Sequence, residues 1–151
     1  SLMAAIALLT GGPDAGPASE LPLRIEKAWV REAPPGANVL AAYATFCNDA
    51  DAAVTLSRVD SENFNAVEMH ASVETESGVS MKRMNSVVIG PNECLAFEPG
   101  GRHFMLIGPK RDFRAGDDME FTLFLANGKE IEIIVPVRRA DEMLKHRRGH
   151  H

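Results

Sequence analysis

Short β-rich segments, each closed by turn residues, constrain the fold of this chain more than any other feature of its sequence. The segments alternate between apolar and polar residues or are rich in β-branched ones, and proline, glycine, asparagine and aspartate lie between them. They span residues 25–31, 39–47, 53–59, 65–73, 79–89, 93–97, 103–107, 119–126 and 130–137. Short strands at such spacing are typical of a β-sandwich or a β-barrel. The sequence therefore predicts an all-β fold.

Three local features refine this prediction. Asn127-Gly128 lies between two apolar β-rich segments and predicts a tight hairpin. Pro136 cannot donate a ladder hydrogen bond, so it favours an edge position for the last strand. Residues 138–144 could form a short helix.

Composition limits the class of protein and its partners. The chain has 151 residues, 45% of them hydrophobic and 25% charged, which is enough for one domain with a real core. Its net charge of −5 argues against nucleic acid as a partner. No apolar run approaches the ~20 residues that a membrane-spanning helix needs. We expect a single, monomeric β domain over residues 21–138, without a membrane span.

The two ends of the chain differ from this domain. Residues 2–9 are apolar and residues 11–18 are mostly small, as in the later part of a secretory signal. Residues 1–20 are therefore predicted to be a disordered signal-peptide remnant, with a flexible leader of other origin as the alternative. Residues 139–151 are predicted to be a flexible tail that contains histidine and methionine.

The chain has two cysteines, Cys47 and Cys94. In an exported protein they could form one disulfide, which would restrict the unfolded chain. Two unpaired thiols are the alternative, because spacing in the sequence does not establish the geometry that a disulfide needs. No Cys-x-x-Cys motif is present, which argues against a redox-active pair.

Four soft side chains, His70, Met81, His103 and Met105, form a candidate metal-binding set, which we call the His/Met set. Thioether sulfur and neutral imidazole suit Cu(I), and they suit Mg²⁺, Ca²⁺ or Mn²⁺ poorly. His103 and Met105 are two residues apart, so on a strand they leave the same face. No cysteine lies in the set, which argues against a blue-copper site. Taken alone, the residue types leave metal binding and ordinary structural roles equally open.

Three other methionines, Met69, Met84 and Met119, are predicted to fill the core. Met69 alternates with His70, and Met84 lies three residues beyond Met81. Both should therefore leave the face opposite to that of their neighbouring candidate ligand.

The spacing His-x10-Met-x21-His-x-Met of the His/Met set resembles that of the periplasmic copper chaperone family PCuAC. Further matching segments occur in the same order, and the resemblance covers residues 24–138. They are Ala28-Trp29-Val30-Arg31, Pro34-Pro35-Gly36-Ala37, Ala42-Tyr43-Ala44-Thr45, Asn48, Val67-Glu68-Met69-His70, Pro99-Gly100-Gly101-Arg102-His103-Phe104-Met105-Leu106, Arg114-Ala115-Gly116-Asp117 and Val135-Pro136-Val137.

This resemblance implies a cupredoxin-like β-sandwich with Greek-key connections. It implies a periplasmic protein that binds Cu(I) through His70, Met81, His103 and Met105, near the surface. It also implies delivery of that copper to an acceptor cuproprotein, the CuA centre of cytochrome c oxidase in particular. Cys47 and Cys94 depart from the family's pattern.

Some relatives in this family carry a His/Met-rich extension that binds a second copper ion. In this chain, Met143, His146, His150 and His151 could form such a site and take Cu(II). The alternative is a disordered tail, with His150 and His151 left from a tag.

Other functions remain open at this stage. The protein could sequester copper without a dedicated acceptor, or it could be a sandwich that binds a protein partner and no metal. We expect no enzyme activity, because no nucleophile triad, carboxylate pair or phosphate-binding loop is apparent. A redox enzyme that uses Cys47 and Cys94 is the single enzymatic alternative.

Overall fold

A computed structural model describes residues 22–143, and this part of the chain is almost entirely β-structure. The predicted all-β fold is therefore confirmed. The strands are β1 (Arg24–Arg31), β2 (Val39–Asn48), β3 (Val54–Asp60), β4 (Phe64–Thr75), β5 (Gly78–Met84), β6 (Val87–Ile89), β7 (Glu93–Phe97), β8 (His103–Pro109), β9 (Asp118–Leu125) and β10 (Glu130–Arg138).

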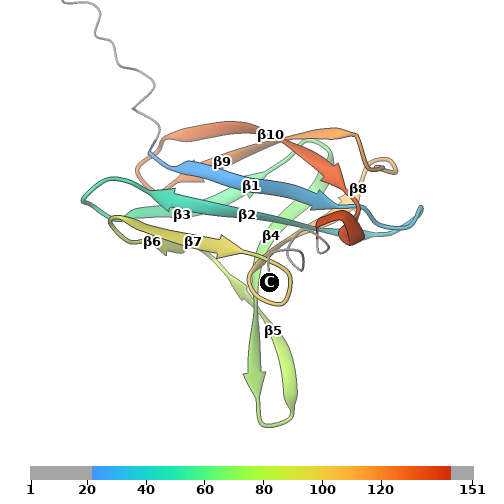
Figure 1. The fold of residues 1–151 in the computed structure, drawn as a ribbon, viewed down its shortest axis with the longest axis horizontal. Coiled ribbons are helices and arrows are strands. Elements are labelled where there is room, and N and C mark those ends of the chain that lie inside the picture. The colour runs from blue at the N-terminus through green and yellow to red at the C-terminus, as the bar shows by residue number, and fades with distance from the viewer. Residues whose placement is uncertain (1–21, 144–151) are drawn as a thin grey trace, which may run out of the picture.

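The strands form one continuous hydrogen-bonded sheet that folds over into two layers (Figure 1). The order is β5-β4-β8-β2-β1-β10-β9-β3-β6, and β7 pairs with the other end of β2. A short parallel pairing of β1 with β10, at Val30 and Val137, joins the two layers. β8 lies between β4 and β2, two strands that are distant from it in sequence, as Greek-key connections require.

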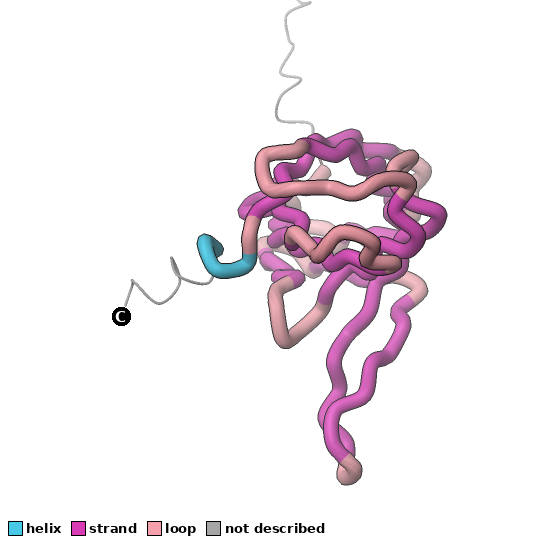
Figure 2. The backbone as a smooth tube through the Cα atoms, turned by 90° about the vertical axis from the view of Figure 1, so that its right-hand side faces the viewer, coloured by secondary structure: helices cyan, strands magenta, loops and turns pink. Residues whose placement is uncertain are grey.

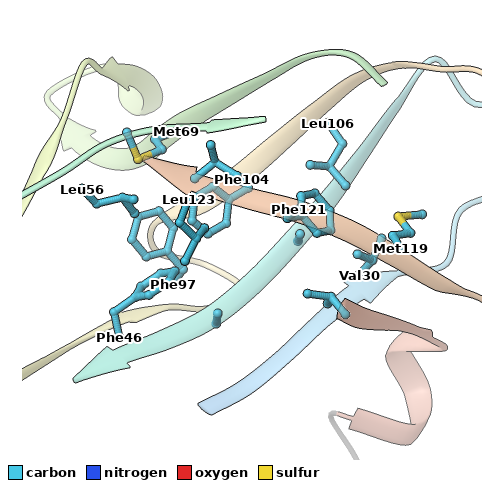
Figure 3. Packing of buried hydrophobic residues seen from close by; sticks show 14 of the residues in the cluster. Val30, Phe46, Leu56, Met69, Phe97, Phe104, Leu106, Met119, Phe121 and Leu123 are labelled. Carbon is cyan, nitrogen blue, oxygen red and sulfur yellow. The ribbon is translucent and has the colours of Figure 1, made fainter. Parts of the chain in front are cut away.

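The core fills the space between the two layers (Figure 3). On β9, the residues from Met119 to Leu125 are buried at every second position, which is the period of a strand with one face inward. The ring of Phe97 from the first layer lies 4.3 Å from that of Phe104 and 5.6 Å from that of Phe46. Met69 and Met119 are buried in this core as predicted, with 5% and 1% of their surfaces exposed.

The segment 79–89, predicted as a single strand, is two strands, so that prediction is wrong. β5 pairs with β4 in the first layer, whereas β6 pairs with β3 in the second. The reason is a break in alternation: Met84 packs against the core and Val87 is buried in it. Residues three apart cannot share one face of a strand. The chain therefore leaves the first layer after Met84 and enters the second at Val87.

The predicted edge position of the last strand is also wrong. β10 pairs with β9 along one side and with the end of β1 along the other. Pro136 pairs with Asp118 of β9, but Val137 N–H donates to the Asp117 carbonyl at 2.8 Å, so by alternation the Pro136 nitrogen faces β1. On that side it precedes the first matched pair of the β1–β10 ladder, Val30 with Val137. Its missing N–H therefore costs no ladder hydrogen bond.

The predicted hairpin at Asn127-Gly128 is confirmed between β9 and β10. The Leu125 N–H donates to the Lys129 carbonyl at 2.9 Å, and Gly128 adopts a φ of 92°, which favours glycine. Beyond β10, residues 140–143 form one helical turn, part of the predicted 138–144 helix. The described chain, 22–143, contains no helix that could span a membrane.

The β4–β5 hairpin projects from the body of the sandwich as an arm (Figures 1 and 2). The pairing of β4 with β8 ends at His70 and His103, and from there residues 71–75 pair with β5 alone. The arm therefore begins at the first predicted ligand.

Cys47 and Cys94 form a disulfide between paired positions of β2 and β7, which resolves the two alternatives left by the sequence. Cys47 is buried and Cys94 is exposed. Next to Cys47 on β2, the buried Asn48 side chain donates to the carbonyls of Ile89 and Gly90 at 3.0 and 3.1 Å. Both contacts fasten the end of β2 to later parts of the chain.

We predict that the double substitution Cys47→Ala/Cys94→Ala lowers the free energy of unfolding by about 2–4 kcal/mol, because the disulfide closes a long loop in the unfolded chain. Urea denaturation of the variant and of the oxidised wild type measures this difference. The reduced wild type serves as a control and should resemble the variant. Equal unfolding midpoints for oxidised and reduced protein would contradict the prediction.

Candidate metal centre

Strand register places all four members of the His/Met set on the outer face of the first layer. His70 on β4 lies opposite His103 on β8. Two residues away along the same strands, Glu68 lies opposite Met105, and on the arm Ser72 lies opposite Met81. Side chains alternate along a strand, so these residues point away from the core that Met69 and Phe104 enter from the other face.

The two imidazoles form the centre of the site. Their ring centroids are 5.8 Å apart and the ring planes are inclined by 25°, a stacked arrangement. The His70 side chain is only 13% exposed. The rings are therefore held side by side at the base of the arm, before any metal binds.

Hydrogen bonds fix which nitrogen of each ring is free. His70 Nε2–H donates to Glu68 Oε1 at 2.9 Å, and His103 Nδ1–H donates to the Gly101 carbonyl at 3.3 Å. The acceptors in both bonds carry no proton, so the neutral rings keep their lone pairs on His70 Nδ1 and His103 Nε2. His70 Nδ1 is buried and has no hydrogen-bond partner. A buried nitrogen without a hydrogen-bond partner can donate its lone pair to a metal ion, which would satisfy it.

The two methionines lie on opposite sides of the imidazole pair. Met105 follows His103 on β8 toward the body and is half-buried. Met81 lies on the arm, opposite Ser72, which is two residues and about 7 Å along β4 from His70. It is 57% exposed, and Ser72 Oγ–H donates to its sulfur at 3.6 Å. The structure thus brings three of the four residues together and holds the fourth at the edge of the site.

Sequence reasoning missed the polar groups around these residues. Glu68 contacts His70, and Arg83, which lies opposite His70 on β5, is 3.7 Å from the other Glu68 oxygen. The signal for Glu68 was present, since it precedes His70 by two residues and so shares its face. Nothing in the sequence indicates that Arg83 lies next to Glu68, because that contact depends on the β4–β5 register.

The arrangement restricts the metals that the site could hold. Within residues 22–143, no three histidine, cysteine, aspartate or glutamate side chains gather in a metal-binding group. A metal at the imidazole pair would need methionine sulfur to complete its coordination. Two imidazoles with thioethers form a soft and neutral ligand set, which fits Cu(I).

The candidate second site in the tail is not tested by the structure. Met143 ends the described helical turn, in a groove that Trp29 and Pro136 also line. His146, His150 and His151 lie outside the described residues, as does the predicted leader of residues 1–20.

A protein family described as "Putative lipoprotein LpqE-like" matches residues 23–137 of the chain. An uncharacterized protein of Rickettsia prowazekii (strain Madrid E) is 29% identical over 98 residues, which are 64% of this chain and 54% of that protein. A Leifsonia xyli subsp. xyli protein, whose name also describes a putative lipoprotein, is 27% identical over 117 residues, which are 77% of this chain and 69% of that protein. The chain thus spans about half of the first relative's length.

Solved structures of PCuAC domains share the fold. The copper-bound PCuAC domain from PmoF2 superposes with a TM-score of 0.68 at 24% identity, over 79% of this chain and 94% of that one. The apo PmoF2 PCuAC domain superposes with a TM-score of 0.67 at 25% identity, over 80% of this chain and 93% of that one. The solution structure of Cu(I)-DR1885 from Deinococcus radiodurans superposes with a TM-score of 0.64 at 24% identity, over 89% of this chain and 87% of that one. These matches confirm the cupredoxin-like sandwich and the resemblance to PCuAC domains.

The exposure of the methionines predicts their order of oxidation. At low peroxide concentration, Met81 should convert to the sulfoxide first among the methionines of residues 22–143, while Met69 and Met119 resist oxidation because the core excludes the reagent. Mass spectrometry of peptides after timed exposure measures each rate. In denaturant all methionines should react at similar rates, which serves as the control. Oxidation of Met119 as fast as Met81 in the folded protein would contradict the described core.

Proposed function

The chain belongs to the LpqE-like family, and we propose that it is an exported protein that binds one Cu(I) ion as cargo and passes it to an acceptor cuproprotein. The observation that carries this proposal is the in-register pair His70 and His103, each with one free lone pair, between two methionines on the same face. His70, Met81, His103 and Met105 are the proposed ligands.

The preference for Cu(I) follows from the ligand chemistry. All four ligands are neutral, so they do not compensate the higher charge of a divalent ion, and thioether sulfur stabilises the lower oxidation state. Zinc sites prefer thiolate, imidazole or carboxylate ligands instead. A copper ion here would remain at the surface, since the site lies on the outer face of the first layer.

The position of Met81 supports transport rather than permanent storage. It is exposed on the projecting arm, and only a weak hydrogen bond from Ser72 holds its sulfur. A ligand of the acceptor could replace this sulfur while the imidazoles and Met105 still hold the ion. Copper would then move through an intermediate that both proteins coordinate, without being released to solvent.

The relatives support the cargo and the compartment. The PmoF2 domain and DR1885 have been solved with copper or Cu(I) bound, and the family and the Leifsonia relative carry lipoprotein names. The lipoprotein names support an exported protein, and we propose the periplasm of a Gram-negative cell as its compartment. The proposed acceptor is a cytochrome c oxidase subunit with a CuA centre, and the proposed carrier is a monomer without enzyme activity. A Cu(II) site in the tail, with Met143, His146, His150 and His151, is a separate proposal that truncation after Arg139 tests.

We predict that Met81→Ala and His103→Ala each weaken Cu(I) binding at least about tenfold, or about 1.4 kcal/mol, because each removes one ligand. Competition with a coloured Cu(I) chelator measures the affinity. Met84→Ala is the matched control: it should keep the affinity and lower the unfolding free energy by about 1–2 kcal/mol, since Met84 packs against the core. Wild-type affinity in both ligand variants would refute the assigned site.

Delivery is tested by mixing the Cu(I)-loaded protein with an apo CuA domain and following the copper content of each after separation. We expect transfer to proceed in the presence of a chelator that captures free Cu(I), because the ion passes through a shared intermediate. Transfer that the chelator abolishes would indicate release to solvent. Retention of copper by the loaded protein would favour the alternative role in sequestration.

A further inference from the structure

We propose that Glu68 is a positioning residue of the site, which fixes the proton of His70 on Nε2 and places a negative charge across the ring from the bound cation. The inference rests on the proposed function for its effect on copper. Its effect on the His70 ring does not depend on any metal.

The hydrogen bond from His70 to Glu68 determines how the ring presents itself. A neutral imidazole carries one proton, and either nitrogen can hold it. Glu68 Oε1 lies 2.9 Å from Nε2, so the proton on Nε2 is stabilised, and the lone pair remains on the buried Nδ1. If the proton moved to Nδ1, that N–H would be buried without an acceptor and Nε2 would face a carboxylate with its lone pair. Both changes are unfavourable, so a single tautomer is preorganised.

Arg83 orients the Glu68 carboxylate. Its Nη1 lies 3.7 Å from Glu68 Oε2, which leaves Oε1 directed at His70. Arg83 is on β5, two residues beyond Met81, and it lies opposite His70 in the ladder. The chain of contacts from Arg83 through Glu68 to His70 therefore connects the arm to the imidazole pair. The Arg83 side chain is largely exposed, so solvent screens this ion pair and the hydrogen bond to His70 is the stronger contact.

The charge of Glu68 complements the ligand set. The four proposed ligands are neutral, and a bound Cu(I) ion would leave the site with a positive charge. Glu68 is partly buried, with 24% of its side chain exposed, and it lies opposite Met105 and next to His70 in space. Its carboxylate therefore lies across the His70 ring from an ion bound at Nδ1, so its charge acts on the ion through the imidazole and it is not one of the proposed ligands. Carboxylates that accept a hydrogen bond from a metal-bound imidazole also raise the basicity of that ligand.

The test compares three variants. Glu68→Ala removes both the acceptor and the charge, whereas Glu68→Gln removes the charge and keeps an oxygen that can accept from Nε2–H. Glu74→Ala removes one charge from the same strand and face, toward the tip of the arm, and serves as the matched control. Urea denaturation of each variant verifies that the fold is retained.

The first readout is the ¹⁵N NMR spectrum of the His70 ring in metal-free protein at pH 8. We expect the Nε2–H tautomer in the wild type, in Glu74→Ala and predominantly in Glu68→Gln. In Glu68→Ala we expect a detectable Nδ1–H fraction, which the burial of Nδ1 keeps a minority. A Glu68→Ala spectrum identical to that of the wild type would overturn the proposal. This result is informative even if the wild type binds no Cu(I), which would refute the proposed function instead.

The second readout is Cu(I) affinity by chelator competition. We expect Glu68→Ala to weaken binding about 10-fold or more, within the range measured for such outer partners of metal ligands. Glu68→Gln should weaken it less, and Glu74→Ala should leave it unchanged. An altered tautomer in Glu68→Ala with wild-type affinity would overturn the claimed effect on copper. Equal losses of Cu(I) affinity in Glu68→Ala and Glu74→Ala would show that net charge alone causes the loss, and this result would also overturn the proposed role of Glu68.

Discussion

The register of β4 with β8 is the constraint on which both the core and the candidate site depend. It places His70 opposite His103 on the outer face and Met69 opposite Phe104 on the inner one. A shift of one residue would turn every side chain of β4 to the other face. Met69 and Val67 would then leave the inner face, and His70 would enter it. The packing of the inner face therefore holds the outer face in place. The same packing sets the geometry of the histidine pair, which needs no further interactions to define it.

Two devices keep this sheet folded over on itself. The parallel β1–β10 contact joins the layers, and the Cys47–Cys94 disulfide with the neighbouring Asn48 fastens the far end of β2. Between them, the aromatic rings of Phe46, Phe97 and Phe104 fill the first layer's inner face. The body is consequently fixed around β2 and β8. The β4–β5 arm lacks such support beyond His70, since residues 71–75 have β5 as their single neighbouring strand.

The sequence allowed the fold and much of the site to be predicted because these depend on local patterns. Alternation located the strands, Asn127-Gly128 located a hairpin, and the two-residue spacing of His103 and Met105 placed them on one face. The break between β5 and β6 was missed because a three-residue step between Met84 and Val87 is visible only once both are known to be buried. Pro136 was misjudged since local chemistry does not indicate where the β1 ladder begins. The Arg83–Glu68 contact and the disulfide depend on pairing between separate strands, which no single segment encodes.

The division between a fixed body and a projecting arm is also a division among the four proposed ligands. Met105 lies where β8 is paired on both sides, His103 begins β8 and pairs with His70, and His70 occupies the last position of β4 that is paired on both sides. These three lie where β4 and β8 join the body of the sandwich. Met81 lies on an edge strand, exposed, with a thioether that accepts one weak hydrogen bond. Moving Met81 therefore disturbs few contacts, whereas moving any of the other three would disturb the core. A carrier needs ligands that hold the ion and one that can be exchanged, and the topology assigns these roles to different strands.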